Sequence, residues 1–512
     1  MFDFQQKLRK FFDYLQVKQR LVLCYFSLLA IINAYTIRYC LDFSLNRIVR
    51  ELAKTKSIKT PLIAKPTTRR ENRNTARTTA RPRPKPRQRA GRDQLKLNPQ
   101  HLQQTQFHAP VITTSNCSDV WTKEVQILVS ASFYAGYMLT HIPGGRLAER
   151  YGGKWILGAS ILLSAILTLL TPTIVRHGGP GALMALRLLI GFCEGPTFPA
   201  VSALLAQWVP ESERGLLCSC VLSGGEIGVI FVHLVNGLSL GEEDWAMAFY
   251  VVGGGAMLWF VGFVLVCYSK PDASPFIQSS EREYIKSQVS DTLITEAETE
   301  ATDTNEAPWS NMLLNAPIWA LIAANMQHDW NQQEMAQELQ QLLHQLQSKS
   351  STLWTELESS LRVTAPHLWS WLASLTSGQL SDYLIANGIL NRTQTRCLMS
   401  WLVFVSSSMY LVYDKQQSAR MWSVLAFGAY YAGIKLLPLD MSPNFAGTLM
   451  GISNGLGSLP GLLLPLLQQL ESEYEIVGSI RAAFWLICAG YISGDVQSYN
   501  QRQRRSNQPI VH

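Results

Sequence analysis

Two runs of this sequence, Trp155–Val175 and Ala246–Tyr268, contain no charged residue. As a helix that rises about 1.5 Å per residue, each run is long enough to cross a hydrocarbon layer roughly 30 Å thick. In lipid a backbone amide of such a run finds its partner inside its own helix, so both runs predict transmembrane helices. The composition agrees, because 47% of the 512 residues are hydrophobic and only 16% are charged, which excludes an ordinary soluble enzyme.

Ten further apolar stretches bring the predicted number of transmembrane helices to twelve. They lie near residues 21–49, 125–147, 181–208, 215–240, 311–328, 352–380, 397–413, 420–438, 445–467 and 478–494. The first stretch follows a basic, amphipathic start without a small-residue cleavage site, so we expect it to serve as its own insertion signal. Basic residues before the first helix and after the last helix place both termini in the cytosol, which requires an even number of helices.

Polar segments divide the chain into two hydrophobic halves. We predict a cytosolic amino-terminal segment over 1–20, a six-helix half over 21–269, a central cytosolic loop over 270–310, a second six-helix half over 311–494 and a cytosolic tail over 495–512. Two pseudo-symmetric halves of this kind are typical of transporters that hold a substrate between the halves and expose it to each side of the membrane in turn.

A basic loop over 50–120 interrupts the first half. From Arg50 to Arg92, fifteen Lys or Arg residues stand against two Glu residues, a net charge of +13, whereas the whole chain carries +7. With so little apolar content the loop is predicted to be disordered, and a solvated linker is the simplest interpretation. Binding to anionic lipid or glycan is the alternative, and a nucleic-acid partner is not expected.

The two halves share a turn motif that follows a helix. The sequence GYMLTHIPGGRLAERYGGK, residues 136–154, ends a hydrophobic helix with paired glycines, a carboxylate and arginines before the next hydrophobic run. In GQLSDY, residues 378–383, a glycine again precedes a carboxylate at a helix end. These repeats predict conformational hinges, and the candidate residues are Gly144, Gly145, Glu149, Arg150 and Asp382.

Six charged residues lie inside predicted membrane helices, namely Arg38, Asp42, Arg187, Glu194, Glu226 and Asp440. A charge in lipid is costly and normally faces a cavity or a partner, so each residue marks a candidate functional site. Arg187 and Glu194 are about two helical turns apart and share one face, on which both can look into a central cavity. A guanidinium binds carboxylate or phosphate and a nearby acid can carry a proton, a pairing suited to cation-coupled anion transport. An ion pair that only fastens two helices is the structural alternative.

Several longer motifs resemble one family of transporters. They are SFYAGYMLTHIPGGRLAERYGGK (132–154), RLLIGFCEGPTFPAVSALLAQWVPESERG (187–215), SEREYI (280–285) and LDMSPNFAGTLMGISNGLGSLPG (439–461). Together they resemble the anion/cation symporters of the major facilitator superfamily, which include sialin, the vesicular glutamate transporters and the sodium-dependent phosphate cotransporters. The resemblance implies an all-α membrane protein with the major facilitator fold, without enzymatic activity. It also implies ion-coupled symport of small organic anions or inorganic phosphate by alternating access.

The resemblance also implies roles for particular residues. Arg38 and Arg187 match arginines of helices one and four and are candidates for binding the substrate anion, while Glu194 matches the acid of helix four that is linked to the proton. Asn454, in a glycine-rich stretch of the second half, is a further candidate for the substrate cavity. Ser130 stands where the vesicular glutamate branch has a histidine, so the substrate of that branch is not implied.

No cofactor is expected, and the implied coupling ion is H+ or Na+. The nine cysteines are scattered without the spacing of a metal site, so neither a metal nor a disulfide framework is predicted. The expected partners are a small anionic substrate and the lipid bilayer. The resemblance implies a plasma membrane or an endolysosomal or vesicle membrane as the location.

One segment departs from the family pattern. After Asn325 the chain reads MQHDWNQQEMAQELQQLLHQLQSKS, in which leucines recur at helical spacing amid glutamines and acids. This pattern is typical of an amphipathic surface helix, so we expect helix seven to be broken after the apolar residues 318–324 or to be displaced. His328 stands about where the glutamate branch has an arginine, and it is either an anion ligand when protonated or a polar filler. The departure leaves an alternative function, a transport-defective relative that serves as a membrane scaffold or polyanion-binding protein.

Overall fold

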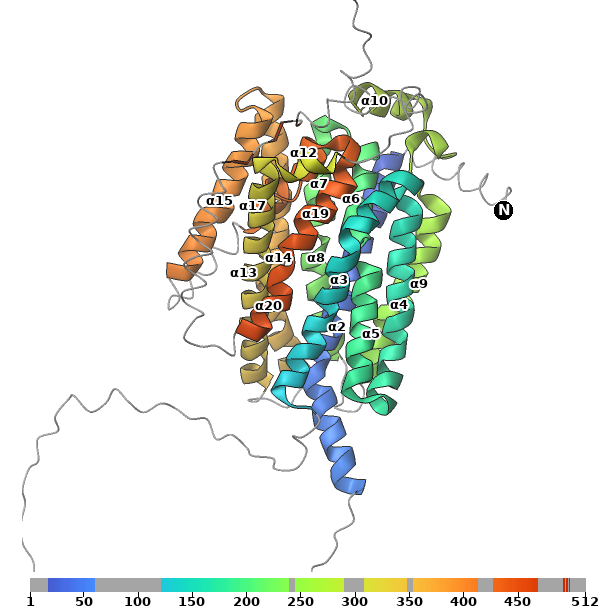
Figure 1. Cartoon of the computed structure of the whole chain (residues 1–512), viewed down its shortest axis with the longest axis vertical. Helices are drawn as coiled ribbons and strands as arrows, with labels where there is room; N and C mark the ends of the chain where they lie inside the picture. Colours follow the sequence, from blue (N-terminus) through green and yellow to red (C-terminus); the bar gives the residue numbers. More distant parts are fainter. Residues whose placement is uncertain are drawn as a thin grey trace, which may run out of the picture. The chain divides into compact units, whose positions relative to one another are not determined.

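The computed structural model describes residues 17–59, 121–238, 245–289, 308–347, 353–412 and 427–467, together with residues 491, 492, 494, 495 and 497. Residues 1–52 and 120–512 form one compact unit, to which the following description applies. Within the described ranges every regular element is a helix. Most of the long helices of this unit run alongside one another, and the short helix α10 (Ser279–Val289) crosses one end of them (Figure 1).

The first half begins with the longest helix, α2. Its described helices are α2 (Gln19–Lys59), α3 (Lys123–Tyr151), α4 (Gly153–His177), α5 (Gly179–Glu194), α6 (Thr197–Trp208), α7 (Arg214–Leu222), α8 (Gly224–Leu238) and α9 (Trp245–Val266). Short turns at Gly195-Pro196 and at Ser223 divide the fourth and fifth predicted spans into two helices each. The side chain of Thr122 caps the start of α3 by accepting from the Val125 amide at 3.3 Å.

The second half contains both long, more polar helices and short ones. Besides α12 (Trp309–Leu313) they are α13 (Ala316–Gln347), α14 (Leu353–Ala386), α15 (Arg392–Val412), α17 (Ala429–Ala432), α18 (Leu437–Met441), α19 (Ala446–Gly457) and α20 (Leu459–Leu467). The predicted span 420–438 contains only α17 and the start of α18 within its described part, with turns between them. The last predicted span, 478–494, lies almost entirely outside the described residues.

Two predicted boundaries differ from the structure. The helix α2 continues to Lys59, so the basic loop predicted to start at residue 50 begins with helix, and residues 60–120 lie outside the described part. The prediction that helix seven breaks after Ala324 is wrong, because α13 is continuous from Ala316 to Gln347. Glutamine, glutamate and leucine are good helix formers, so the polar composition of this segment is compatible with helix extension.

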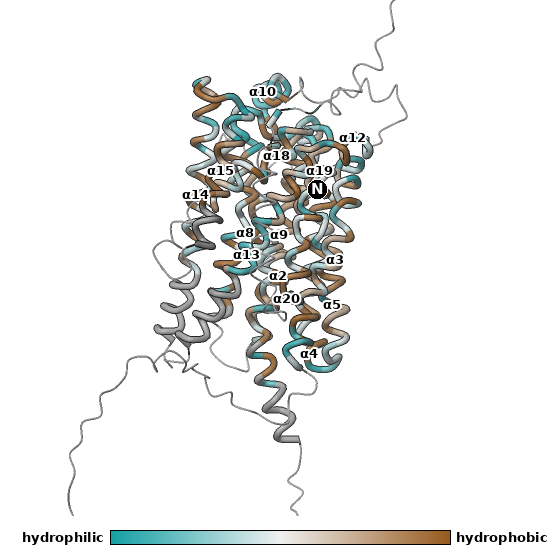
Figure 2. The backbone as a smooth tube through the Cα atoms, turned by 60° about the vertical axis from the view of Figure 1, so that its left-hand side comes forward, coloured by the Kyte–Doolittle hydropathy of each residue, from teal (hydrophilic) through white to brown (hydrophobic). Residues whose placement is uncertain are grey.

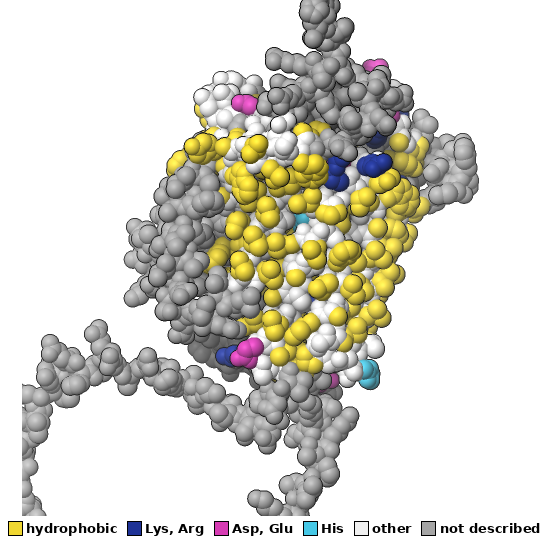
Figure 3. Space-filling view, in the orientation of Figure 1, with side chains coloured by type: hydrophobic (Ala, Val, Ile, Leu, Met, Phe, Trp, Pro, Cys, Tyr) yellow, Lys and Arg dark blue, Asp and Glu magenta, His cyan; other side chains and the backbone are white. Residues whose placement is uncertain are grey.

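Five segments of the described chain are long and apolar enough to cross a membrane. They are Gln19–Leu45, Gly153–His177, Gly179–Trp208, Glu211–Val235 and Trp245–Val266, all in the first half. In the view of Figure 3, hydrophobic side chains cover the middle of the visible face, and charged side chains lie toward its upper and lower ends. Such an apolar band suits a lipid-facing surface. Figure 2 shows that hydrophilic stretches also occur inside the bundle, near α8 and α13.

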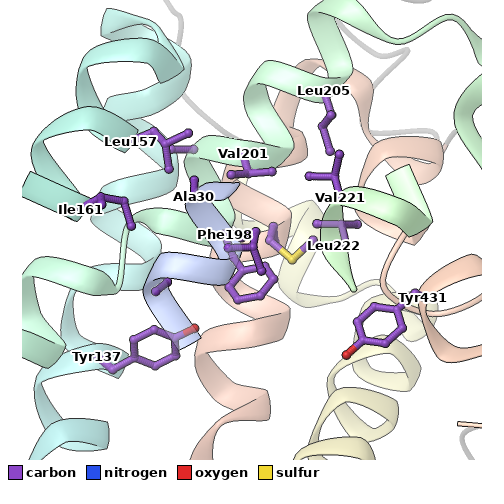
Figure 4. Packing of buried hydrophobic residues seen from close by; sticks show 14 of the residues in the cluster. Ala30, Tyr137, Leu157, Ile161, Phe198, Val201, Leu205, Val221, Leu222 and Tyr431 are labelled. Carbon is purple, nitrogen blue, oxygen red and sulfur yellow. The ribbon is translucent and has the colours of Figure 1, made fainter. Parts of the chain in front are cut away.

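The two halves meet at two groups of helices. In one group α3 and α6 of the first half contact α19 of the second, and α3 also contacts α20. In the other group α7 and α8 of the first half contact α14 of the second. One apolar core runs through both halves, and Figure 4 shows part of it, with Leu157 of α4, Phe198 of α6 and Tyr431 of α17.

Candidate functional site

Arg38 of α2 is buried among aromatic rings. Its guanidinium carbon lies 4.3 Å from the ring centroid of Tyr137, 4.8 Å from that of Tyr35 and 5.0 Å from that of Phe133. Aromatic faces attract a cation, and the attraction is strongest where water is excluded. The Nε of Arg38 has no hydrogen-bond partner among the described residues. The rings therefore hold the charge in place while donors of the guanidinium remain available.

The carboxyl group of Glu194 on α5 is fully buried beside this guanidinium. Its Oε1 lies 3.4 Å from Nη2 of Arg38, whereas its Oε2 has no hydrogen-bond partner within the part of the chain that the structure describes. An unpaired oxygen of a buried carboxylate is costly, and protonation of the acid relieves that cost. Arg38 thus holds Glu194 through one carboxylate oxygen only.

Arg187 contacts α2 at Asp42, one helical turn after Arg38, which Glu194 contacts. Its Nη2 lies 3.2 Å from Oδ2 of Asp42, and its Nη1 donates to the carbonyl oxygen of Arg38 at 2.9 Å. Ser130 donates to Oδ1 of the same aspartate at 2.8 Å. Arg187 and Glu194 thus share one face of α5, as their spacing predicted, but that face meets α2. Neither residue lines the cavity described next, and Arg187 holds the backbone that carries Arg38.

A cavity of about 30 Å³ lies beside Arg38, and its walls come from α2, α3 and α8 of the first half and from α13 and α14 of the second. The charged residues of its wall are Arg38, Glu226 and Asp329, and the remaining residues are mainly aromatic rings, two histidines and two glutamines. A volume of this size holds about two water molecules. The site must therefore widen before it can take an organic molecule.

Glu226 of α8 is surrounded by donors from the second half. Its Oε2 lies 2.7 Å from Nδ1 of His367, and its Oε1 accepts from the Gln332 amide at 2.9 Å and from the Tyr431 hydroxyl at 3.1 Å. The cluster therefore connects the two halves across the cavity. Glu226 was one of the charges that the sequence singled out, but His367 was not, because a lone histidine within a helix carries no distinctive pattern.

The helix α13 turns a polar face toward the cavity. Asp329, Gln332 and Gln333 are three and four residues apart, so they share one face, and all three line the cavity. Gln333 donates to the hydroxyl of Tyr134. His328 does not line the cavity, because its ring stacks on Tyr430 with 3.5 Å between ring centroids.

The interpretation of the polar segment after Asn325 as a surface helix is therefore wrong in its first part. Asn325, Gln327, His328 and Asn331 are all buried, and their neighbours Gln332 and Gln333 bond to the first half. Amphipathic periodicity reports that a helix has two different faces, but a polar face can point either to bulk water or to an internal cavity. Here it points inward, so the observation that favoured a transport-defective protein no longer does so.

Asn454 of α19 lies outside the cavity wall, in a buried network that reaches Arg38 through Tyr137. Its Nδ2 lies 2.8 Å from Nε2 of His141 and 3.3 Å from the Tyr137 hydroxyl, and its Oδ1 accepts from Lys435. Nδ1 of His141 lies 2.9 Å from the carbonyl oxygen of Tyr137, so that nitrogen carries the proton and Nε2 accepts from the amide. Lys435 had no sequence signal that the predictions used.

The predicted hinge carboxylates each cap a helix of the opposite half. Glu149, at the end of α3, accepts from the backbone amide and the hydroxyl of Thr448, both at 2.6 Å, at the start of α19. Asp382, near the end of α14, accepts from the backbone amides of Gly215 and Leu216, both at 2.8 Å, at the start of α7. A carboxylate at a helix start satisfies unpaired amides and complements the helix dipole. The two caps therefore join the two halves at the end of the bundle where α3 and α14 end and α7 and α19 begin.

The other predicted hinge residues differ in their surroundings. At Gly145 a Cβ atom would lie 2.3 Å from the carbonyl oxygen of Gly447, so the close approach of α3 and α19 requires glycine there. Gly144 packs in the same way against Pro196. Arg150 is exposed, and its guanidinium lies over the ring of Tyr151. Another arginine, Arg146, pairs with Glu149 at 3.4 Å.

We expect Glu149→Ala and Asp382→Ala each to weaken this closure. Loss of a helix cap costs about 0.5–2 kcal/mol, which corresponds to roughly 2- to 30-fold faster hydrogen exchange of the amides at the starts of α7 and α19. Because both caps close the same end, each variant should accelerate exchange at both helices. Exchange measured by mass spectrometry provides the test, and Arg150→Ala is the matched control that should change neither helix. If hydrogen exchange became faster only at the helix that has lost its own cap, the two caps would not act together as one gate.

A buried network of charges lies at the same end. Asp440 of α18 accepts from Nε of Arg396 at 2.7 Å and from Nη1 of Arg214 at 3.2 Å, and all three side chains are at most 2% exposed. Arg396 also donates to the Ser381 hydroxyl at 2.6 Å. Arg214 stands at the start of α7, so this network too joins the first half to the second.

Comparison with known proteins decides the family. A family model described as Major Facilitator Superfamily matches residues 97–465. The chain belongs to this superfamily. A solved major facilitator structure, the proton:xylose symporter XylE bound to 6-bromo-6-deoxy-D-glucose, superimposes with a TM-score of 0.56 at 13% identity, over 93% of this chain and 98% of XylE. That likeness confirms the predicted major facilitator fold.

Sequence relatives within the superfamily agree with the motifs. Sialin of Homo sapiens is 29% identical over 384 residues, which cover 73% of this chain and 75% of sialin. A putative inorganic phosphate cotransporter of Drosophila melanogaster is 27% identical over 78% of each chain, and vesicular glutamate transporter 2 of Homo sapiens is 30% identical over 68% of this chain and 59% of the relative. This major facilitator is therefore a multi-pass membrane transporter and not an enzyme, and its substrate is a small molecule.

Proposed function

We propose that this major facilitator carries a small organic anion or inorganic phosphate across the membrane together with a proton. The observation that carries the proposal is the Arg38–Glu194 pair. Arg38 lines the cavity with a donor to spare, and a guanidinium binds the oxygens of carboxylate and phosphate groups. Relatives named as a phosphate cotransporter and a glutamate transporter support an anionic substrate.

Coupling of proton and anion transport follows because ionised Glu194 and the substrate anion compete for Arg38. While Glu194 is ionised, its Oε1 occupies the guanidinium at 3.4 Å. Protonation removes that negative charge, so Arg38 can bind the anion, and bound anion in turn favours the protonated acid. Proton and anion then bind to one conformation together. The single unpaired oxygen of Glu194 suits a proton, and we propose H+ as the coupling ion.

In the proposed alternating access, the Glu149 and Asp382 caps form a gate at the end of the bundle where α10 lies. Both predicted cytosolic termini and the capped starts of α7 and α19 lead us to propose that this end faces the cytosol and that the present state is closed toward it. Opening requires release of the Glu149 and Asp382 caps. We propose the plasma membrane or an endolysosomal or vesicle membrane as the location, since sialin and the glutamate transporter are among the relatives.

Uptake into proteoliposomes tests the proposal. Labelled phosphate, sialate, glutamate and urate are supplied under an imposed proton gradient or an imposed sodium gradient. We expect one anion to accumulate with the proton gradient, and Glu194→Gln to abolish that accumulation while exchange of labelled for unlabelled anion continues. The glutamine keeps the shape of the acid but cannot lose a proton.

The matched control is Asp272→Asn, since Asp272 is exposed and lies outside the cavity. Accumulation that follows only the sodium gradient would refute H+ as the coupling ion. Proton-driven accumulation that survives Glu194→Gln would remove Glu194 from the coupling mechanism.

A further inference from the structure

Lys154, in the first turn of α4, is a buried cation without an acidic partner. The residue is 8% exposed, and its Nζ lies 4.2 Å from the ring centroid of Tyr268 and 5.3 Å from that of Trp155. Within the described ranges Nζ donates no hydrogen bond, and no carboxylate interacts with its charge. A lysine that is buried to this degree normally has such a partner.

The position of Lys154 in its helix makes the missing partner more costly. The start of a helix carries partial positive charge, which favours anions and disfavours cations. The helix α4 has no acidic residue in its first turn, and no side chain caps its start. Glu149, the acid nearest to Lys154 in the sequence, bonds to Thr448 of the opposite half. The start of α4 therefore combines two sources of positive potential for which the described chain supplies no anion.

The residues around Lys154 are of the kinds found where a membrane protein meets lipid headgroups. Tyr151 is 63% exposed and Trp155 is 58% exposed, and such aromatic rings are enriched at the headgroup level of a bilayer. Arg150 is exposed and forms no ion pair with the residues that the structure describes. In Figure 3 basic side chains lie among hydrophobic ones near the upper end of the visible face. The turn between α3 and α4 therefore presents cations beside exposed aromatic rings.

The chain that follows α9 holds this turn in place. Trp208 donates from Nε1 to the carbonyl oxygen of Tyr268 at 3.0 Å, and the hydroxyl of Ser269 accepts from the backbone amide of Lys154 at 3.1 Å. Gly152, between α3 and α4, has a φ of 90°, and a Cβ atom there would lie 2.6 Å from the Ser269 hydroxyl. The positions of Lys154 and of the Tyr268 ring are thus fixed before any ligand binds, which lowers the entropic cost of binding.

We propose that Lys154 and Arg150 bind the phosphate group of an anionic phospholipid in the leaflet beside this turn. A phosphate oxygen supplies the acceptor that Nζ of Lys154 lacks, and the acyl chains lie along the exposed rings of Tyr151 and Trp155. An anionic headgroup is favoured over a zwitterionic one, because neither cation has an acidic partner and the ammonium group of a zwitterionic lipid would meet only positive charge. None of these four residues lines the cavity beside Arg38, so the lipid site is separate from the transported substrate.

Native mass spectrometry of the purified full-length protein tests the proposal. Phosphatidylserine and phosphatidylcholine with identical acyl chains are supplied at equal concentrations, and we expect the wild type to retain phosphatidylserine preferentially. Lys154→Met keeps the length of the side chain without its charge and should weaken phosphatidylserine binding about 10-fold or more, the effect of a charge-assisted hydrogen bond. Lys154→Arg should retain most of the binding. Arg150→Ala should weaken it about fivefold, and because Arg150 is exposed this variant stays informative even if Lys154→Met fails to fold.

Lys286→Met is the matched control, since it removes the same charge from an exposed lysine at this end of the bundle and should leave phosphatidylserine binding unchanged. Equal binding of the two lipids by the wild type would overturn the proposal, and so would an equal loss of phosphatidylserine in Lys154→Met and Lys286→Met. If Lys154→Met lowered thermal stability but kept phosphatidylserine binding, Lys154 would serve packing alone. If inorganic phosphate without lipid gave the same Lys154-dependent thermal stabilisation as phosphatidylserine, the site would bind free phosphate and not a lipid.

Discussion

Arg38→Ala is expected to reduce uptake of the transported anion by about 30- to 1,000-fold or more. The substitution removes the guanidinium that lines the cavity, and truncation of one partner of a buried charge pair costs about 2–5 kcal/mol. Arg38→Lys should recover only part of the activity, because an ammonium group lacks the planar fork of donors that matches a carboxylate or phosphate. Initial rates in proteoliposomes at equal protein density provide the measurement.

The amount of folded Arg38→Ala protein in the membrane should stay close to that of the wild type. The group left without its partner is Glu194, which can become neutral by binding a proton. Arg282→Ala is the control, since Arg282 is 38% exposed at the bundle end and pairs only weakly with Asp272 at 3.7 Å. Wild-type uptake by Arg38→Ala at normal expression would exclude Arg38 from substrate binding.

Asp440→Asn is expected to lower the free energy of unfolding by about 3–5 kcal/mol, the cost of removing one partner from a buried ion pair. Asp440 is the shared acceptor of Arg214 and Arg396, and both guanidinium groups would keep their charges in a site that is almost free of water. Thermal or denaturant unfolding of the detergent-solubilised protein measures the change. The variant should also open the gate, because Arg214 and Asp440 belong to different halves.

Asp272→Asn is the matched control for stability. Asp272 is 57% exposed and lies 3.0 Å from Nζ of Lys286, and an exposed pair of this kind contributes about 0–1 kcal/mol. A similar loss of stability in both variants would mean that the buried network has no special importance for the fold.

The groups that close the bundle end lie apart from the Arg38–Glu194 pair. The Glu149 and Asp382 caps and the Asp440 network lie at one end of the bundle, whereas the Arg38–Glu194 pair lines the interior. Closure and the proposed substrate binding therefore use separate groups. A change in the cavity can influence the gate only through movement of helices that carry both cavity residues and gate residues. These helices are chiefly α3 and α14.

The sequence by itself determined most of the described helices and the family. Uncharged runs such as Trp155–Val175 indicate helices because lipid offers the backbone no other partner. The charged residues within the membrane helices could also be recognised in the sequence, since few charges interrupt the apolar runs. Local motifs singled out Glu149 and Asp382 as hinge candidates. All of this information lies within about twenty consecutive residues, the length of one helix.

Only the tertiary structure decided which groups meet. Arg38 and Glu194 are 156 residues apart in the sequence, and Glu149 and Thr448 are 299 residues apart. No local periodicity specifies such a pair. The polar face of α13 was misassigned for the same reason, because a helical pattern separates two faces without indicating whether the polar one meets bulk water or a cavity. Packing against α19, α20 and α14 turned that face inward and placed Asp329 opposite Arg38.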